Sequence, residues 1–203
     1  MAFDVEKLTT FCMDEIRRFA ERHQNEVFYA FAIDASLLCL NSEEEFAATL
    51  RQYQDEWDRK TRPVQRWEDL TEGDLRDSEF LLGLHERHSG LDRFDKSSCL
   101  HVINESRSRD REKGNPYRNP QEMQSLRENT GDWAYQGFAD MAGIDGFDDE
   151  AYGEHYDMSE DRQKTSAYGA AMNVLIERLC SRNTFTWLKT APSFYATRVE
   201  HNY

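Results

Sequence analysis

Two short apolar runs near the start of the chain limit its fold more than any other feature. The first, Val27–Ile33, is dense in aromatic and β-branched residues, and the second is Leu37–Leu40. Residues of these types favour extended strands, and the intervening Asp34-Ala35-Ser36 has the composition of a turn. The pattern predicts a β-hairpin, which needs further elements packed against it to be stable in water.

Amphipathic helices are predicted on both sides of the hairpin. Before it, with Asp4 as the N-cap, apolar residues recur every three or four positions at Leu8, Phe11, Cys12, Ile16 and Phe19. After it, Ser42 is expected to cap a second helix and to form a capping box with Glu45. The apolar positions of that helix are Phe46, Leu50, Tyr53 and Trp57.

The C-terminal part predicts a long helix and a closing strand. Asp157 and Glu160 have capping-box spacing, and the helix is expected to end near Asn183. Its core face would consist of Tyr168, Met172, Leu175, Ile176 and Leu179. The alternating run Phe194–Val199 predicts the strand. The whole pattern indicates an α+β fold, a mostly antiparallel sheet with helices packed on one face, as a single domain over residues 1–203.

The middle of the chain is less regular. A helix is expected near Asp74–His88, followed by a short strand at Cys99–Asn104. The stretch 105–121, from Glu105 to Gln121, has mixed charge, two prolines, a glycine and no apolar periodicity. This composition predicts an exposed or mobile loop within the domain.

The charge balance narrows the partners that the chain can bind. The sequence has 39 acidic and 25 basic residues, and its formal net charge is -14. Such a field repels nucleic acid and anionic lipid, so neither nucleic acid nor membrane is expected as a partner, and a basic protein is favoured. An alternative is that the acidity serves only solubility.

The cysteines and the chain start indicate a reducing compartment. Cys12, Cys39, Cys99 and Cys180 occur singly, as buried reduced thiols do, and form no disulfide or zinc pattern. The sequence has no signal-peptide pattern at its start and no apolar run of membrane-spanning length. A cytoplasmic location is expected.

Common enzyme motifs are absent from the sequence, which contains no P-loop, G-x-G-x-x-G, G-x-S-x-G or H-E-x-x-H pattern. The nearest metal pattern is HERH at 85–88, followed by Cys99 and His101, but zinc requires three or four ligands in fixed geometry. No metal, no cofactor and no catalytic residue is therefore predicted.

The stretch Ile144–Asp161 carries eight carboxylates, three aromatic residues and one histidine, without any Lys or Arg. Its spacing around Gly146 does not match a calcium loop, and so hydrophilic a run favours solvated carboxylates over catalytic ones. Its aromatic residues could pin a solvated loop to the core or anchor a basic partner. The predicted partner contacts are Asp148, Asp149, Glu150, Tyr152, Glu154, Tyr156 and Asp157.

Three segments resemble a known family. They are YAFAID at Tyr29–Asp34, LRENTGDWAYQGFADM at Leu126–Met141, and the closing Phe185–His201. Together with their order along nearly the whole chain, they resemble the bacterial family known as domain of unknown function 4303. The resemblance implies no established enzymatic activity, and some similar proteins are thought to be immunity proteins that bind and block a toxin encoded beside them.

The resemblance carries over no catalytic residues. Asp132, Trp133 and Tyr135 match the central element of the family, but a capping or turn Asp and two core aromatics are favoured over a functional site as the explanation. The leading hypothesis is a cytoplasmic immunity protein that neutralises a cognate toxin or effector domain, basic at its active site, through its acidic, aromatic-bearing surface. The main alternative is an enzyme or small-ligand-binding protein with a pocket near Asp132 and Trp133, to which His85 or His101 could contribute. A third possibility is a structural or regulatory binding module without any toxin.

Overall fold

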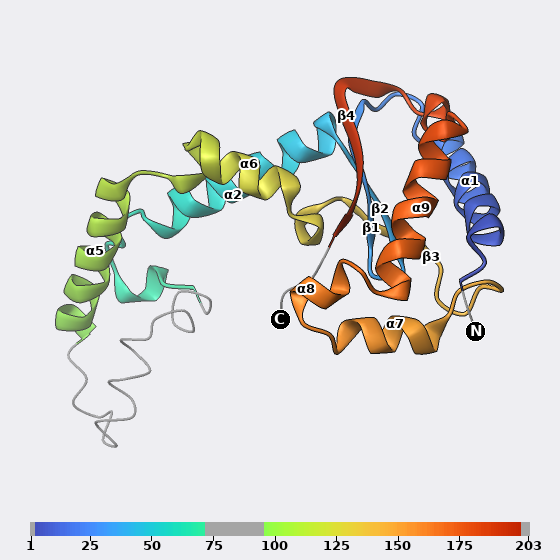
Figure 1. Ribbon diagram of the computed structural model, residues 1–203. Coiled ribbons are helices and arrows are strands. Elements are labelled where there is room, and N and C mark those ends of the chain that lie inside the picture. The colour runs from blue at the N-terminus through green and yellow to red at the C-terminus, as the bar shows by residue number, and fades with distance from the viewer. Residues whose placement is uncertain (1–2, 72–95, 200–203) are drawn as a thin grey trace. The chain divides into compact units, whose positions relative to one another are not determined.

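The computed structural model describes residues 3–71 and 96–199 of the chain (Figure 1). The helices and strands in this part are α1 (Val5–Arg22), β1 (Phe28–Asp34), β2 (Leu37–Ser42), α2 (Glu43–Lys60), α5 (Lys96–Lys113), α6 (Pro120–Glu128), β3 (Tyr135–Asp140), α7 (Asp149–Tyr156), α8 (Glu160–Gln163), α9 (Ala167–Ser181) and β4 (Thr190–Val199). Short 3-10 turns at 67–69, 116–118, 130–132 and 184–187 complete them. The predicted α+β class is confirmed.

The chain divides into two compact units. The first contains Met1–Thr49 and Gln124–Tyr203, and therefore the whole sheet with α1, α7, α8 and α9. The second contains Leu50–Met123, with most of α2 and all of α5. The boundaries fall inside α2 and α6. The expectation of a single domain over 1–203 stays a prediction.

The sheet is mixed, with strand order β3-β2-β1-β4. The predicted hairpin is confirmed, since β1 and β2 pair antiparallel, and β3 pairs antiparallel with β2 on the outer side. The predicted closing strand is β4, which pairs with β1 in the parallel direction. The sheet is therefore mostly antiparallel, as predicted, with one parallel pair. Alternating hydropathy marks a strand but carries no information about its direction.

A register shift in β1 decides which side chains face the helices. The pairing of β1 with both neighbours is irregular between Phe28 and Ala30. An extra residue at this point reverses the alternation of side chains. Phe28 therefore joins Phe31 and Ile33 in the main core, and Tyr29 packs outside it.

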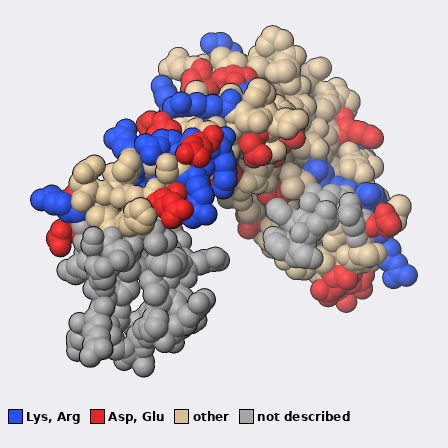
Figure 2. Space-filling view, turned by 90° about the vertical axis from the view of Figure 1, so that its left-hand side faces the viewer, with Lys and Arg blue, Asp and Glu red and all other residues tan. Residues whose placement is uncertain are grey.

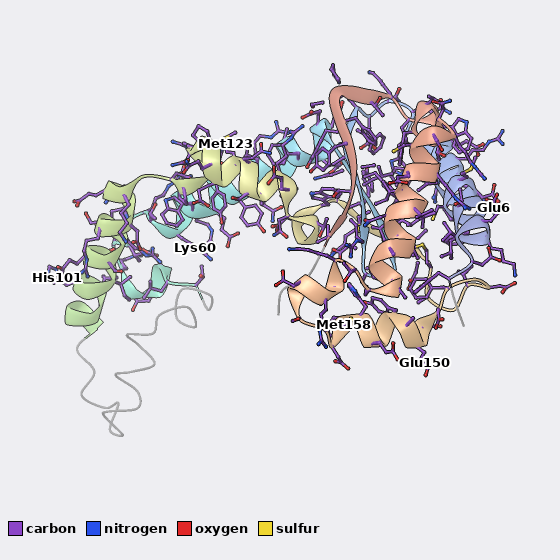
Figure 3. The ribbon with its side chains drawn as sticks, in the orientation of Figure 1. Glu6, Lys60, His101, Met123, Glu150 and Met158 are labelled. Carbon is purple, nitrogen blue, oxygen red and sulfur yellow. The ribbon has the colours of Figure 1, made fainter. Side chains whose placement is uncertain are left out.

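Helices α1 and α9 lie side by side on one face of the sheet (Figure 1). The predicted apolar positions form the core there: Leu8, Cys12, Ile16 and Phe19 from α1, and Tyr168, Met172, Leu175 and Leu179 from α9. At the surface, Glu6 of α1 accepts hydrogen bonds from Arg178 and Arg182 of α9 at 2.9 and 2.8 Å (Figure 3). The contact between the two helices is thus apolar inside and ionic at its edge.

Side chains from several short segments cover the opposite face of the sheet. The hydroxyl of Tyr29 donates to the carbonyl of Arg127 and accepts from the amide of Asn41, both at 2.9 Å. The guanidinium of Arg127 lies 3.6 Å from the centroid of the Tyr29 ring and pairs with Glu43. The indole N–H of Trp133 donates to the same carbonyl of Arg127. All seven residues of β1 are buried as a result.

The predicted start of α2 is confirmed, except for the capping box. The hydroxyl of Ser42 accepts from the backbone N–H of Glu45 at 3.2 Å, as an N-cap does. The reciprocal bond of a capping box needs the backbone N–H of Ser42, which donates to the side chain of Asn41 instead. Of the predicted apolar positions, Phe46 is buried.

In the second unit, the strand predicted at Cys99–Asn104 is wrong, and the predicted exposed loop over 105–121 is largely helical although none of its residues is buried. Helix α5 runs through Lys113, and beyond it a 3-10 turn at 116–118 leads into α6. Arg, Lys and Glu have high intrinsic helix propensity, and the first helix breaker is Gly114, at φ 83°. The predicted helix near 74–88, with the HERH motif, lies outside the described residues.

The predicted single long helix is divided into α7, α8 and α9. Asp157 is the C-cap of α7, and the N-cap of α9 is Ser166, whose hydroxyl accepts from the N–H of Gly169. Both Ser and Asp are favourable caps, so capping chemistry alone does not select between them. The predicted end of the helix is confirmed, because Asn183 adopts a left-handed conformation just beyond it.

Candidate functional site

The stretch Ile144–Asp161 is mostly helical, and its first aromatic residues hold it to the core. The carbonyl of Gly146 accepts from the N–H of Asp4 at 2.8 Å. The ring of Phe147 meets Phe3 edge-on at 5.4 Å, and Tyr152 lies 5.1 Å from Tyr168 between ring centroids. Phe147 and Tyr152 therefore anchor the stretch internally.

Asp148, one of the predicted partner contacts, is the N-cap of α7. Its Oδ1 accepts from the backbone N–H of Ala151 at 3.1 Å, and the residue is only 6% exposed. This hydrogen bond lowers the pKa of the Asp148 carboxyl below its usual value. The structure thus gives Asp148 a role in starting the helix.

The other predicted acidic contacts lie on the exposed side of α7 and at its C-cap. Among the described residues, Asp149, Glu150, Glu154 and Asp157 have no Lys or Arg in ion-pair contact. Asp145 and Asp161, at the two ends of the stretch, pair with Lys7 and Lys164. Tyr156, among these carboxylates, is 51% exposed. We call the five residues Asp149, Glu150, Glu154, Tyr156 and Asp157 the α7 surface.

The charges of the α7 surface do not all favour the helix that carries them. Asp149 and Glu150 stand at the positive end of the helix dipole, but Glu154 and Asp157 stand at the negative end. A misplaced charge there costs about 0.3–1 kcal/mol, and a like-charged i,i+4 pair such as Glu150 and Glu154 costs about 0.2–0.5 kcal/mol. Glu150 points away from the sheet (Figure 3). Local stability therefore does not explain this charge pattern.

Elsewhere in the described structure, carboxylates lie next to basic side chains, as over much of the upper part of the face drawn in Figure 2. Ion pairs within helices are one form of such compensation, for example Lys60 with Glu56 in α2 and Lys113 with Asp110 in α5. Such pairs stabilise exposed helices slightly and neutralise local charge. The α7 surface lacks this compensation.

A cavity of about 360 Å³ lies beside α7. Side chains from the hairpin turn, α7, α8 and α9 line it, among them Asp34, Tyr152, His155, Tyr156, Gln163 and Tyr168. Tyr152 and Tyr156 belong to the predicted contact set. No pattern in the sequence indicates that Asp34, far away in the chain, shares a cavity with them.

Hydrogen bonds fix the wall of this cavity. The hydroxyl of Ser166 accepts from the N–H of Gly169 at 2.9 Å and donates to the carbonyl of Gln163 at 3.0 Å. Its hydroxyl oxygen also lies 2.7 Å from Nδ1 of His155. The serine is thus a helix cap that also holds the imidazole in the wall of the cavity.

A second polar cluster joins α1 to the sheet. Glu26 accepts from the hydroxyls of Ser42 and Tyr135, at 2.7 Å each, and lies 2.8 Å from Nδ1 of His23. Burial opposes ionisation, but the hydrogen bonds from Ser42, His23 and Tyr135 together lower the pKa of Glu26. Burial, and then Glu26, raise the pKa of Tyr135. The donors and the acceptor satisfy one another, as in a structural network.

Asp132 and Trp133, around which the alternative hypothesis placed a ligand pocket, make contacts within the fold. Trp133 is 4% exposed and packs against the ring of Tyr29. Asp132 accepts from the amide of Asn129 in the adjacent turn. Neither residue lines the cavity beside α7. His101 is exposed on α5, and His85 lies outside the described residues.

Within residues 3–71 and 96–199, no three His, Cys, Asp or Glu side chains are arranged to hold a metal ion. None of the helices in those same ranges has the length and apolar character needed to cross a bilayer. Comparison of the chain with protein-family models, curated proteins and solved structures finds no match. The resemblance to domain of unknown function 4303 therefore stays a prediction.

Proposed function

We propose that the chain is a cytoplasmic immunity protein that binds a cognate toxin or effector domain through the α7 surface and so neutralises it. The observation that carries this proposal is the half-exposed ring of Tyr156 among carboxylates that have no ion-pair partner in the described structure. The toxin as partner comes from the family resemblance, and the surface chemistry comes from the residues themselves.

The chemistry of the α7 surface suits a basic protein partner. Uncompensated carboxylates accelerate the encounter with a positive surface, and this effect weakens as salt rises. A large aromatic side chain then supplies apolar area that the partner can bury. A toxin that acts on nucleic acid or nucleotides needs a basic groove, which such a surface could cover.

The test neutralises α7 without removing its cap. In the variant Asp149→Asn/Glu150→Gln/Glu154→Gln, Asp148 stays in place. The lost repulsion between Glu150 and Glu154 and the lost charge of Glu154 at the negative end of the dipole offset the two favourable charges removed from the first turn, so folding should be preserved. The partner would first be captured with the tagged wild-type protein at low salt and tested for toxicity. We expect the variant to bind it about tenfold more slowly, with a flatter salt dependence.

The matched control changes net charge by the same amount elsewhere. Asp14, Glu128 and Glu177 are exposed and lie outside the α7 surface, so they can be changed to Asn, Gln and Gln. If the control slows binding as much as the α7 variant, the effect reflects only total charge. An unchanged association rate in the α7 variant would exclude this surface as the recognition site.

A further inference from the structure

We propose that β4 pairs with the β4 strand of a second copy of this chain, antiparallel about a two-fold axis, so that two sheets join into one. The inference goes beyond the proposed function and does not depend on it. Strand β4 lies beside α9 at one end of the strand order (Figure 1). Because β1 is its only neighbour among the described strands, its outer side is an edge of the sheet.

The regular part of β4 lacks the residues that usually protect such an edge. Beyond a register shift near its start, β4 pairs with β1 from Tyr195 to Val199. Natural sheet edges resist further pairing through charged side chains, prolines or bulges. The sequence of this part is YATRV, and its one charged residue, Arg198, has its guanidinium 6.0 Å from the centroid of the Tyr168 ring. This charge therefore lies over the helix-covered face and does not guard the edge.

The other edge of the same sheet, β3, has the usual protection. Its pairing with β2 shifts register between Leu38 and Leu40, and Gly137 has a φ of 66°. The strand then ends at Asp140. An irregular backbone and a terminal charge both hinder the addition of a further strand. The contrast between the two edges indicates that β4 is the one available for pairing.

An uncharged cavity of about 270 Å³ lies beside β4. Phe194 and Ala196 of β4, Phe185 of the preceding turn and Cys180 of α9 contribute to its lining, and none of the described residues that line it is charged. Small-molecule sites extend from about 300 to 1,000 Å³, so this cavity suits a single side chain. A strand added to β4 would bring its side chains next to the cavity.

The charges favour a second copy as the occupant of this edge. The formal net charge of the chain is -14, so two copies repel one another except where their surfaces carry little charge. The edge from Tyr195 to Val199 and the cavity contain no carboxylate, so nothing in them attracts a basic partner. Antiparallel pairing of a strand with its own copy is self-complementary, and two-fold dimers are the commonest assemblies of identical chains.

The first test is sedimentation velocity of the full chain. We expect a dimer with a dissociation constant on the order of 10 μM, as for a small interface, and therefore a transition between about 1 and 100 μM. Added salt should strengthen the dimer, because it screens the repulsion between two acidic chains, whereas it should weaken binding through the α7 surface. A chain that stays monomeric over this whole range in high salt would overturn the inference.

Backbone hydrogen exchange then locates the contact. In the dimer, the N–H groups of β4 that point away from β1 should exchange about tenfold more slowly than in a dilute sample, and those of β3 should not change. If β4 is protected only after the captured toxin partner is added, the edge belongs to that partner and self-pairing is wrong.

Charged side chains at the edge provide the matched variants. Tyr195 is 37% exposed, and Tyr195→Glu or Tyr195→Lys would each place like charges close to one another across the two-fold axis. Each variant should therefore dimerise about tenfold more weakly than the wild type. An equal mixture of the two variants brings opposite charges together and should restore association as a heterodimer.

The control is Trp187→Glu, an equivalent change at an equally exposed aromatic residue. Trp187 is 40% exposed, and its ring centroid lies 5.8 Å from the guanidinium of Arg17 in α1, away from β4. This variant should dimerise like the wild type. A dimer that is insensitive to Tyr195→Glu, or a mixture of folded Glu and Lys variants that stays monomeric, would show that β4 is not the contact.

Discussion

Gly153 in α7 and Gly169 in α9 show how differently two helical glycines can be constrained. A Cβ atom added at Gly153 would meet nothing within 4 Å. The same atom at Gly169 would lie 2.5 Å from the backbone oxygen of Gln163. Gly153→Ala should therefore stabilise the protein by about 1 kcal/mol, and Gly169→Ala should destabilise it by about 1–3 kcal/mol. Urea denaturation of both variants measures the two differences.

The two changes in the free energy of unfolding are expected to have opposite signs, so each variant is the control for the other. Both substitutions remove the same backbone freedom from the unfolded chain. If Gly169→Ala were also stabilising, the close approach of α8 to the start of α9 would not exist in solution.

Glu26 should make stability depend on acid pH. Its pKa is lowered in the folded protein, so as pH falls the unfolded carboxyl, with a pKa of about 4.3, binds a proton first. The contribution of Glu26 is thus complete above pH about 4.3 and is lost as pH falls through the folded pKa. Glu26→Gln should cost about 2 kcal/mol at neutral pH, and this difference should shrink towards pH 3.

Urea denaturation of the wild type and Glu26→Gln between pH 3 and 7 provides the measurement. Glu21→Gln is a suitable control, because Glu21 is exposed in α1 and its ion pair with Arg17 is long, at 4.0 Å. A difference between the wild type and Glu26→Gln that stays constant with pH would contradict an ionised, hydrogen-bonded Glu26.

At the scale of the helix, α7 depends on its cap. Asp148→Ala removes the acceptor for the N–H of Ala151 and should destabilise the protein by about 1 kcal/mol. Asp149→Ala, one residue later and exposed, should have a much smaller effect. Circular dichroism and thermal unfolding of the two variants make the comparison. Equal losses would show that the cap is not formed.

Elements with a clear apolar period could be predicted from the sequence. Such a period marks α1 and the core face of α9, because burial of one face determines these helices. The hairpin is marked instead by two continuous apolar runs, since its strands are buried on both faces. An apolar period does not predict helix α5, because this helix has no apolar face. It forms because its Arg, Lys and Glu residues have high intrinsic helix propensity. The break between α7 and α9 could not be predicted either, because Asp157 and Ser166 are both residues that favour the N-cap position, and the sequence does not show which of them begins the long helix.

The candidate site was only partly predictable for a related reason. The seven predicted contacts share one stretch, but the helical period divides them into inward residues such as Tyr152 and outward ones such as Glu154. The cavity depends on tertiary packing, which brings Asp34 of β1 close to Gln163 of α8. No local pattern in a single sequence connects two residues so far apart.

At the scale of the whole molecule, the thiols should report on global unfolding. Burial raises the pKa of Cys12 to about 12 and that of Cys39 to about 11, whereas Cys180 is exposed. In a Cys99→Ser background, a thiol reagent at pH 8 should label Cys180 at once. Cys12 and Cys39 should react only at the rate of opening of the core.

Mass spectrometry of the labelled protein over time distinguishes the three thiols. Addition of urea below the unfolding midpoint should accelerate Cys12 and Cys39 together, since both lie in the first unit. Rapid labelling of either thiol in native buffer would contradict the closed core.

The parallel pairing of β1 with β4 has a consequence for synthesis on the ribosome. Phe28 pairs with Thr190 and Ala30 with Tyr195, so nearly the whole chain separates the two partners. Until β4 emerges, the nascent β1 has an unpaired edge made of residues that are all buried in the finished protein. Exposed apolar edges invite association with other chains. Interrupted translation upstream of Thr190 should therefore leave a product that requires chaperones or is degraded.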